Sequence, residues 1–160
     1  GNLSGGNQQK VLLAKWMFAD PDILILDEPT ANFDPEFKQD FLNVIMQFME
    51  SGKKSVIIAS HILDELDRIA DYLIYLDKGD LVYSGDIESF RDKYRIISGE
   101  SYKVKLLKQE DIIHAEDRKY GTKALVVNHG YSKYDGALTV TVPTLEEFMY
   151  HYSKRGESVI

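Results

Sequence analysis

The sequence has 160 residues, a net charge of −7 at pH 7 and no cysteine. This length fits one domain, or part of a domain followed by an appended segment. Without cysteine the chain forms neither a disulfide scaffold nor a thiolate metal site. No apolar run approaches the roughly 18 residues that a membrane helix needs. The acidic balance argues against broad binding to nucleic acids, which favours a basic surface, so no nucleic-acid partner is expected.

The beginning of the chain predicts two helices separated by a strand. A helical pattern covers residues 6–19 and stops at the Asp-Pro pair that follows. Residues 23–26 form a short apolar run, which is typical of a parallel strand that is buried on both faces. Asp34 is a good N-cap and is followed by proline, which favours the first helical position. A second helix is therefore predicted over residues 35–51, ending at a glycine.

The middle of the chain continues this alternation. Residues 55–60 predict a second apolar strand, and residues 62–70 predict a short amphipathic helix. Two strands at 72–76 and 81–83 flank Asp-Lys-Gly-Asp, which is typical of a β-hairpin, and a helix is expected over 86–94. The pattern indicates an α/β fold with parallel strands. Because the two apolar strands need neighbours on both sides, we expect this chain alone to expose an apolar sheet edge or face.

The character of the sequence changes near residue 98. We therefore predict a first domain over residues 1–98 and a small α+β appendage over residues 99–160. The appendage is expected to contain strands at 102–107, 124–128 and 138–142 and a final helix, Leu145–Ser153. Its three histidines share no spacing that would indicate a metal site; they are His114, His129 and His151.

The first candidate motif opens the first predicted helix with Ser4, Gly5 and Gly6. Backbone N–H groups at the start of a helix are unpaired and attract anions. Glycine, which has no side chain, lets a phosphate approach the backbone closely. These residues suit a phosphate, although a plain N-cap explains the same serine and glycines.

The second candidate motif is a pair of carboxylates, Asp27 and Glu28, directly after the first apolar strand. Open α/β sheets place ligands at the carboxyl ends of their strands. Asp27 suits Mg2+, a hard cation that takes oxygen ligands. Glu28 suits a base that orients and deprotonates a water. The alternative is a solvated acidic turn, which an apolar strand ending in Asp-Glu-Pro-Thr disfavours.

Asp34 and His61 complete the candidate set. Asp34 is the expected helix cap, and a second role for its carboxylate is compatible with capping. His61 directly follows the second apolar strand, with Ser60 before it, at the sheet edge that carries Asp27 and Glu28. There it suits a hydrogen bond to a terminal phosphate, whereas a lone histidine elsewhere is usually structural or on the surface.

In their order and spacing these four motifs resemble the ATP-binding cassette (ABC) ATPase family over residues 1–95. Residues 3–10 resemble its signature motif, residues 23–28 its Walker B strand with the catalytic glutamate, and residues 31–34 its D-loop; His61 resembles its switch histidine. The sequence departs from the family's common residues at Asn7, Lys10 and Phe33. The resemblance implies the C-terminal portion of a P-loop NTPase sheet with flanking helices, followed by the appendage.

The resemblance also implies ligands and partners. ABC ATPases bind ATP and Mg2+ between two ATPase subunits arranged head to tail, and they dock on transmembrane permease subunits at the cytoplasmic face of the cell membrane. In that picture Asp27 holds Mg2+, Glu28 positions the attacking water and His61 contacts the γ-phosphate. The nucleotide-binding residues implied in the same way are those of the signature and the D-loop: Ser4, Gly5, Gly6, Asn7 and Asp34, the last bridging the two sites.

The phosphate-binding loop of such enzymes, Gly-x-x-x-x-Gly-Lys-Ser/Thr, does not occur in the sequence. In the family this loop lies upstream of the signature motif. We therefore expect the chain to be a piece of a longer ATPase, active in the intact protein. Taken alone, the 160-residue chain is expected to show no significant ATPase activity and no tight ATP binding.

The direction of transport depends on weaker features. Residues 144–148 resemble the tail of ATPases from drug and peptide exporters, which favours an exporter, although the same residues also form a simple amphipathic helix. Residues 7–10 resemble the end of the signature in monosaccharide importers, so a sugar-type importer is the alternative. A soluble ABC ATPase outside transport and an inert structural piece are the remaining alternatives.

Overall fold

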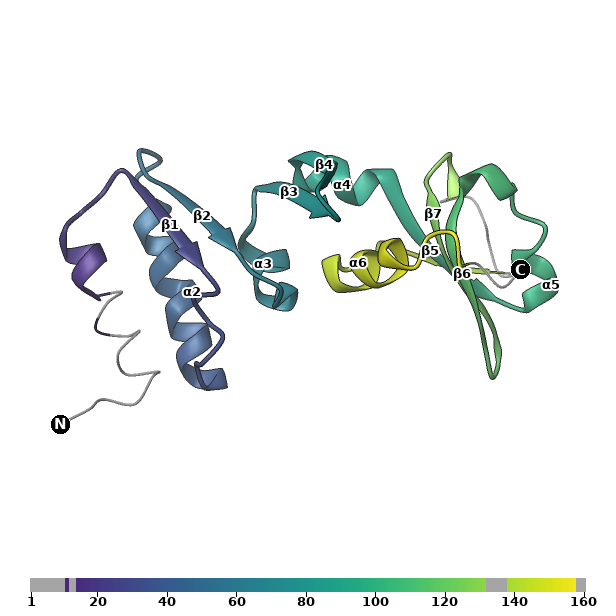
Figure 1. The fold of residues 1–160 in the computed structure, drawn as a ribbon, viewed down its shortest axis with the longest axis horizontal. Coiled ribbons are helices and arrows are strands. Elements are labelled where there is room, and N and C mark those ends of the chain that lie inside the picture. Colours follow the sequence, from purple (N-terminus) through teal and green to yellow (C-terminus); the bar gives the residue numbers. More distant parts are fainter. Residues whose placement is uncertain (1–10, 12–13, 132–137, 158–160) are drawn as a thin grey trace. The chain divides into compact units, whose positions relative to one another are not determined.

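The structure is a computed structural model that describes residues 11, 14–131 and 138–157 (Figure 1). The chain divides into two compact units, Gly1–Ile69 and Ala70–Ile160. Each unit is described separately below.

The first unit is an α/β layer (Figure 1). Strands β1 (Ile23–Asp27) and β2 (Ser55–Ala59) pair in parallel, with Ile23 opposite Ser55 and Asp27 opposite Ala59. The helices α2 (Pro35–Met49) and α3 (Leu63–Ile69) follow the two strands. The predicted α/β pattern with parallel strands is thereby confirmed. Residues 14–18 are helical, as predicted, while the start of that predicted helix lies outside the described residues.

Helix α2 begins as its sequence predicts. The Asp34 carboxylate accepts a hydrogen bond from the Phe37 amide at 2.9 Å, and proline occupies the first turn. The helix ends at Met49, two residues before the predicted end, and Gly52 follows with a φ of 66°. A positive φ is the conformation in which glycine commonly terminates helices.

One face of the β1–β2 pair packs on α2, and the other face is largely exposed among the described residues. The core on the packed side consists of apolar side chains from the strand, the loop and the helix: Leu24, Phe33, Phe41, Leu42, Ile45 and Phe48. On the open side Ile23, Ile25 and Ile57 are 60%, 73% and 56% exposed. The predicted burial of both strand faces is therefore wrong for this chain, because α2 covers only one side. The expected exposed apolar face is present.

The second unit starts with a β-hairpin. Strands β3 (Tyr72–Asp77) and β4 (Asp80–Asp86) pair antiparallel, and the turn between them holds Lys78 and Gly79 at φ values of 51° and 91°. Two positive φ values match the turn that suits the twist of a hairpin. Helix α4 (Ile87–Lys93) follows, capped by Asp86. The hairpin and the helix were both predicted, and the observed strands are longer than the predicted ones.

A four-stranded antiparallel sheet in the order β6-β7-β5-β8 forms the rest of the second unit (Figure 1). Its strands are β5 (Tyr94–Gly99), β6 (Ile112–Arg118), β7 (Gly121–Val127) and β8 (Leu138–Thr141). The helical elements are α5 (Ser101–Val104), the 3-10 helix η1 (Gln109–Asp111) and α6 (Leu145–Ser153). The predicted strands near 124–128 and 138–142 and the final helix are confirmed.

One expectation for this region is wrong, two strands were not predicted, and the domain boundary stays open. Residues 102–107 were predicted to form a strand, but α5 and a turn occupy this segment. Val104 and Leu107 are both buried, and a spacing of three suits one face of a helical turn better than a pleated strand. Strands β5 and β6 were not predicted; the second half of β6 is charged, which hides its strand character. Strand β5 spans the predicted domain boundary at residue 98, whereas the two compact units of the structure meet after Ile69. The domain assignment stays a prediction.

Candidate active site at the ends of β1 and β2

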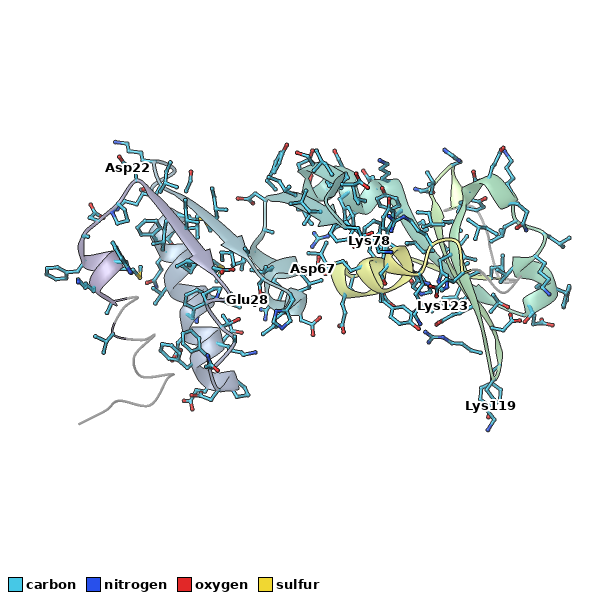
Figure 2. The ribbon with its side chains drawn as sticks, in the orientation of Figure 1. Asp22, Glu28, Asp67, Lys78, Lys119 and Lys123 are labelled. Atoms are coloured by element: carbon cyan, nitrogen blue, oxygen red, sulfur yellow. The ribbon has the colours of Figure 1, made fainter. Side chains whose placement is uncertain are left out.

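The parallel pairing of β1 and β2 brings the predicted catalytic residues to one sheet edge. Asp27 lies opposite Ala59, and the Glu28 amide donates to the Ala59 carbonyl at 2.8 Å, so the pairing extends one residue beyond the strands. Glu28 and His61 each follow the end of one of these strands and meet there. Figure 2 labels Glu28 just beyond the tip of β1.

Three hydrogen bonds hold the Glu28 carboxylate. The Ser60 hydroxyl donates to Oε2 at 2.9 Å. The His61 backbone amide donates to Oε1 at 2.9 Å, and the His61 ring contacts the same oxygen through Nδ1 at 2.6 Å. A carboxylate accepts about four hydrogen bonds, so a further donor, such as a water, still finds room on this group.

The backbone of Glu28 adopts an unusual conformation. Its φ is 43°, in the left-handed region, which costs a non-glycine residue on the order of 1 kcal/mol. The surrounding turn is held by hydrogen bonds from the Ala31 amide to the Glu28 carbonyl at 3.3 Å and from the Phe33 amide to the Thr30 carbonyl at 3.0 Å. Backbone strain of this kind concentrates at functional sites, which supports a dedicated position for the Glu28 side chain.

The electrostatics of the site keep Glu28 ionised. The hydrogen bond from the His61 ring lowers the pKa of the Glu28 carboxyl, partial burial opposes this effect, and the bonds from Ser60 and the His61 amide add to the lowering. The Glu28 side chain is 35% exposed and the His61 side chain 75%. Because a carboxylate with a low pKa is a weak base, the arrangement suits orienting a water better than removing a proton from it at the outset.

Asp27 is the residue that was predicted to hold Mg2+. It is exposed at the carboxyl end of β1, and among the described residues its carboxylate has no hydrogen-bonding or ionic partner. The described part of the chain contains no group of three or more His, Cys, Asp or Glu side chains arranged to hold a metal ion. Mg2+ is commonly held by one or two carboxylates together with substrate phosphates and water, and the metal role of Asp27 stays a prediction.

The described structure does not test the other predicted nucleotide-binding residues. Ser4, Gly5, Gly6 and Asn7 lie outside the described residues. Asp34 caps α2, and its predicted role between two subunits stays a prediction. No role was predicted for Ser60; the sequence places it directly after β2, but its contact with Glu28 is seen only in the structure.

A hollow of about 480 Å3 lies beside β1. Its lining is mostly apolar and comes from the first helix, β1, the following loop and α2: Trp16, Pro21, Ile23, Leu24, Ile25, Leu26, Asp27, Pro29, Phe33 and Phe41. This mostly apolar lining does not suit a triphosphate.

Comparisons with known proteins relate the chain to ABC transporters. The sequence profile of the ABC transporter family matches residues 1–31. The L-arabinose transport ATP-binding protein of Geobacillus stearothermophilus is 47% identical over 77 residues, which cover 48% of this chain and 15% of that protein. The energy-coupling factor transporter ATP-binding protein of Mycoplasma mobile is 36% identical over 126 residues, covering 74% of this chain and 46% of that protein.

A solved structure of an ATP-binding cassette of an ABC transporter in its ADP conformation is also similar, with 26% identity and a TM-score of 0.46, covering 56% of this chain and 35% of that one. The chain spans less than half the length of each of these relatives. Within the described residues, no helix has both the length and the apolar character needed to cross a membrane.

Proposed function

We propose that this chain, as part of an ABC-type ATPase domain, belongs to a protein that hydrolyses ATP to drive transport. The observation that carries the proposal is the Glu28 carboxylate, held by Ser60 and His61 at the strand edge that also presents Asp27. The relatives named as transport ATP-binding proteins support the same reading.

Each residue at this edge has a proposed task. Asp27 would hold Mg2+, which neutralises charge on the phosphates when it is bound. Glu28 accepts a hydrogen bond from the attacking water and orients it. His61 holds Glu28 through Nδ1, which leaves Nε2 as its second polar atom. The Nδ1–H donates to an ionised carboxylate, so Nε2 must also carry a proton in order to donate to a phosphate oxygen.

The partners and the location are also proposals. We infer a second ATPase subunit, arranged head to tail, whose Ser4, Gly5, Gly6 and Asn7 meet the nucleotide held by the first, with Asp34 between the two sites. We also infer transmembrane permease subunits as partners. The ATPase would dock on them at the cytoplasmic face of the cell membrane and couple ATP hydrolysis to transport. These inferences rest on the motif resemblance and on the relatives' names as transporter ATP-binding proteins.

The direction of transport has two candidates. The predicted exporter rests on the tail helix, yet Leu145 and Phe148 of that helix are buried in the second unit, which explains their apolar character by packing alone. A relative named for ribose, galactose and methyl galactoside import is 45% identical over 78 residues. This relative favours an importer as the second candidate.

The substitution Glu28→Gln in the full-length protein tests the proposed function. Glutamine keeps the size of the side chain but is a much poorer acceptor and base, so hydrolysis should fall on the order of 10²- to 10⁴-fold while ATP still binds. Phosphate release and bound nucleotide are measured together. The exposed Glu50, at the end of α2, supplies the control Glu50→Gln, which should hydrolyse ATP as the unmodified protein does. Equal turnover by the Glu28→Gln protein would remove Glu28 from the catalytic role.

A further inference from the structure

Ser60 is the described residue that contacts the second oxygen of the Glu28 carboxylate. Its hydroxyl donates to Oε2 at 2.9 Å, whereas both contacts from His61 go to Oε1. With bonds to Oε1 alone, the carboxyl group keeps freedom to rotate about its terminal torsion, which is broad for glutamate. A donor on each oxygen restricts that rotation.

The Ser60 hydroxyl is itself held in place. Its oxygen accepts a hydrogen bond from the Ile62 amide at 3.0 Å while its proton is donated to Glu28. The side chain is partly buried at the end of β2, and the pairing of Asp27 with Ala59 sets its distance from the Glu28 backbone. Ser60 therefore links the start of the segment after β2 to the carboxylate after β1.

The left-handed backbone of Glu28 gives the hydrogen bond from Ser60 a second effect, which is to stabilise that conformation. The φ of 43° directs the residue out of the extended path of β1, and side-chain bonds to the neighbouring strand help to offset the cost of that conformation. Two of the three bonds to the Glu28 carboxylate come from His61, one from its backbone amide and one from its ring. The His61 side chain is 75% exposed and is proposed to contact the nucleotide. Ser60 has no proposed contact with the nucleotide, so its bond to Oε2 does not depend on where the exposed His61 ring lies.

We propose that Ser60 is a positioning residue that fixes the plane of the Glu28 carboxylate and thereby aims its free acceptor site at the attacking water. The inference rests on the proposed function of Glu28 and adds to it a residue for which no role was predicted from the sequence. Ser60 contacts neither nucleotide nor water in this account; it acts through Glu28.

The test uses the full-length protein with Ser60→Ala, which removes the donor, and Ser60→Thr, which keeps the hydroxyl. Loss of one hydrogen bond to a charged group should lower kcat on the order of 10-fold. The KM for ATP should stay within about twofold, because the bond orients water and does not bind nucleotide. Ser60→Thr should restore most of the lost kcat. The control Ser55→Ala makes the same change at the opposite, exposed end of β2 and should leave kcat unchanged.

A second readout needs no nucleotide. In the nucleotide-free protein, Ser60→Ala should shift the side-chain carboxyl carbon resonance of Glu28 in the NMR spectrum, and Ser55→Ala should not. If Ser60→Ala unfolds the protein, Ser60→Cys, which keeps the size but donates weakly, takes its place in both measurements.

The outcomes separate this inference from the proposed function. Turnover by Glu28→Gln equal to that of the unmodified protein would sink both. A loss of turnover in Glu28→Gln together with an unchanged kcat and Glu28 resonance in Ser60→Ala would overturn the role of Ser60 alone. A rise in KM with constant kcat, or a failure of threonine to rescue, would also contradict it.

Discussion

The histidines of the second unit show how residue chemistry depends on contacts that span the sequence. His114 on β6 and His151 on α6 are 3% and 1% exposed, and their Nδ1 atoms lie 2.8 Å apart. One ring must donate to the other, so the pair needs at least one neutral ring. The sequence contains no local signal for this pair, because the two histidines are 37 positions apart and meet only through the packing of α6 on β6.

The titration of this pair should make the second unit sensitive to acid. Burial lowers the pKa of His114, and burial together with the neighbouring His114 lowers the pKa of His151 to about 4. Glu116 raises both values, while Lys154 lowers that of His114 and Lys123 and Arg118 lower that of His151. Burial prevails, so the folded unit favours neutral rings.

The free energy of unfolding should therefore be highest above pH 6.5, the ordinary pKa of histidine, and should fall as the pH drops from 6.5 toward 4. In this window the unfolded chain binds protons that the folded pair resists, and the loss should be on the order of 2–3 kcal/mol. Urea unfolding at several pH values measures it. The double variant His114→Leu with His151→Leu should flatten this part of the curve, although carboxylates still titrate below it. An unchanged acid limb in the double variant would contradict the assignment.

At the scale of elements, local signals in the sequence predicted much of the first unit and less of the second. The apolar runs of β1 and β2 and the cap of α2 are local patterns, and the structure confirms them. In β6, His114 and Ala115 are buried, but residues 116–118 at its end are all charged. The segment therefore has no clear strand pattern of its own and forms a strand by pairing with β7. The edge that joins Glu28 to His61 was predictable because carboxyl ends of parallel strands meet at one edge. The role of Ser60 was not, since it needs the distance to Oε2.

The cap of α2 separates a structural role of Asp34 from its proposed role between subunits. Asp34→Ala removes the acceptor of the Phe37 amide and should lower the free energy of unfolding by about 1 kcal/mol. Asp34→Asn keeps a good capping side chain but removes the charge, so it should lose only a small part of this stability. Urea midpoints compare the two variants. Equal destabilisation by alanine and asparagine would mean that the charge, and not the cap, supplies the stability.

At the scale of the whole molecule, the described site contains only part of what the proposed ATP hydrolysis needs. Glu28, Ser60 and His61 form a connected edge, and Asp27 offers one carboxylate beside it. The sequence contains no glycine-rich loop with its lysine, which in P-loop enzymes cradles the phosphates and provides most of their contacts. On the open face of β1 and β2, Ile23, Ile25 and Ile57 are each more than half exposed, so among the described residues this sheet packs on one side.

The purified 160-residue chain should therefore neither hydrolyse ATP at a significant rate nor bind it tightly. Asp27 by itself is a weak Mg2+ ligand, because Mg2+ keeps most of its water unless substrate phosphates join the carboxylate. The signature residues Ser4, Gly5 and Gly6 are proposed to act on a nucleotide that another subunit holds, and this chain offers no phosphate loop to hold one. Isothermal titration with Mg-ATP and a phosphate-release assay measure the two properties, with Glu28→Gln as a control for contaminating ATPase. Micromolar binding, or steady turnover that Glu28→Gln abolishes, would mean that the edge at Glu28 suffices without the loop.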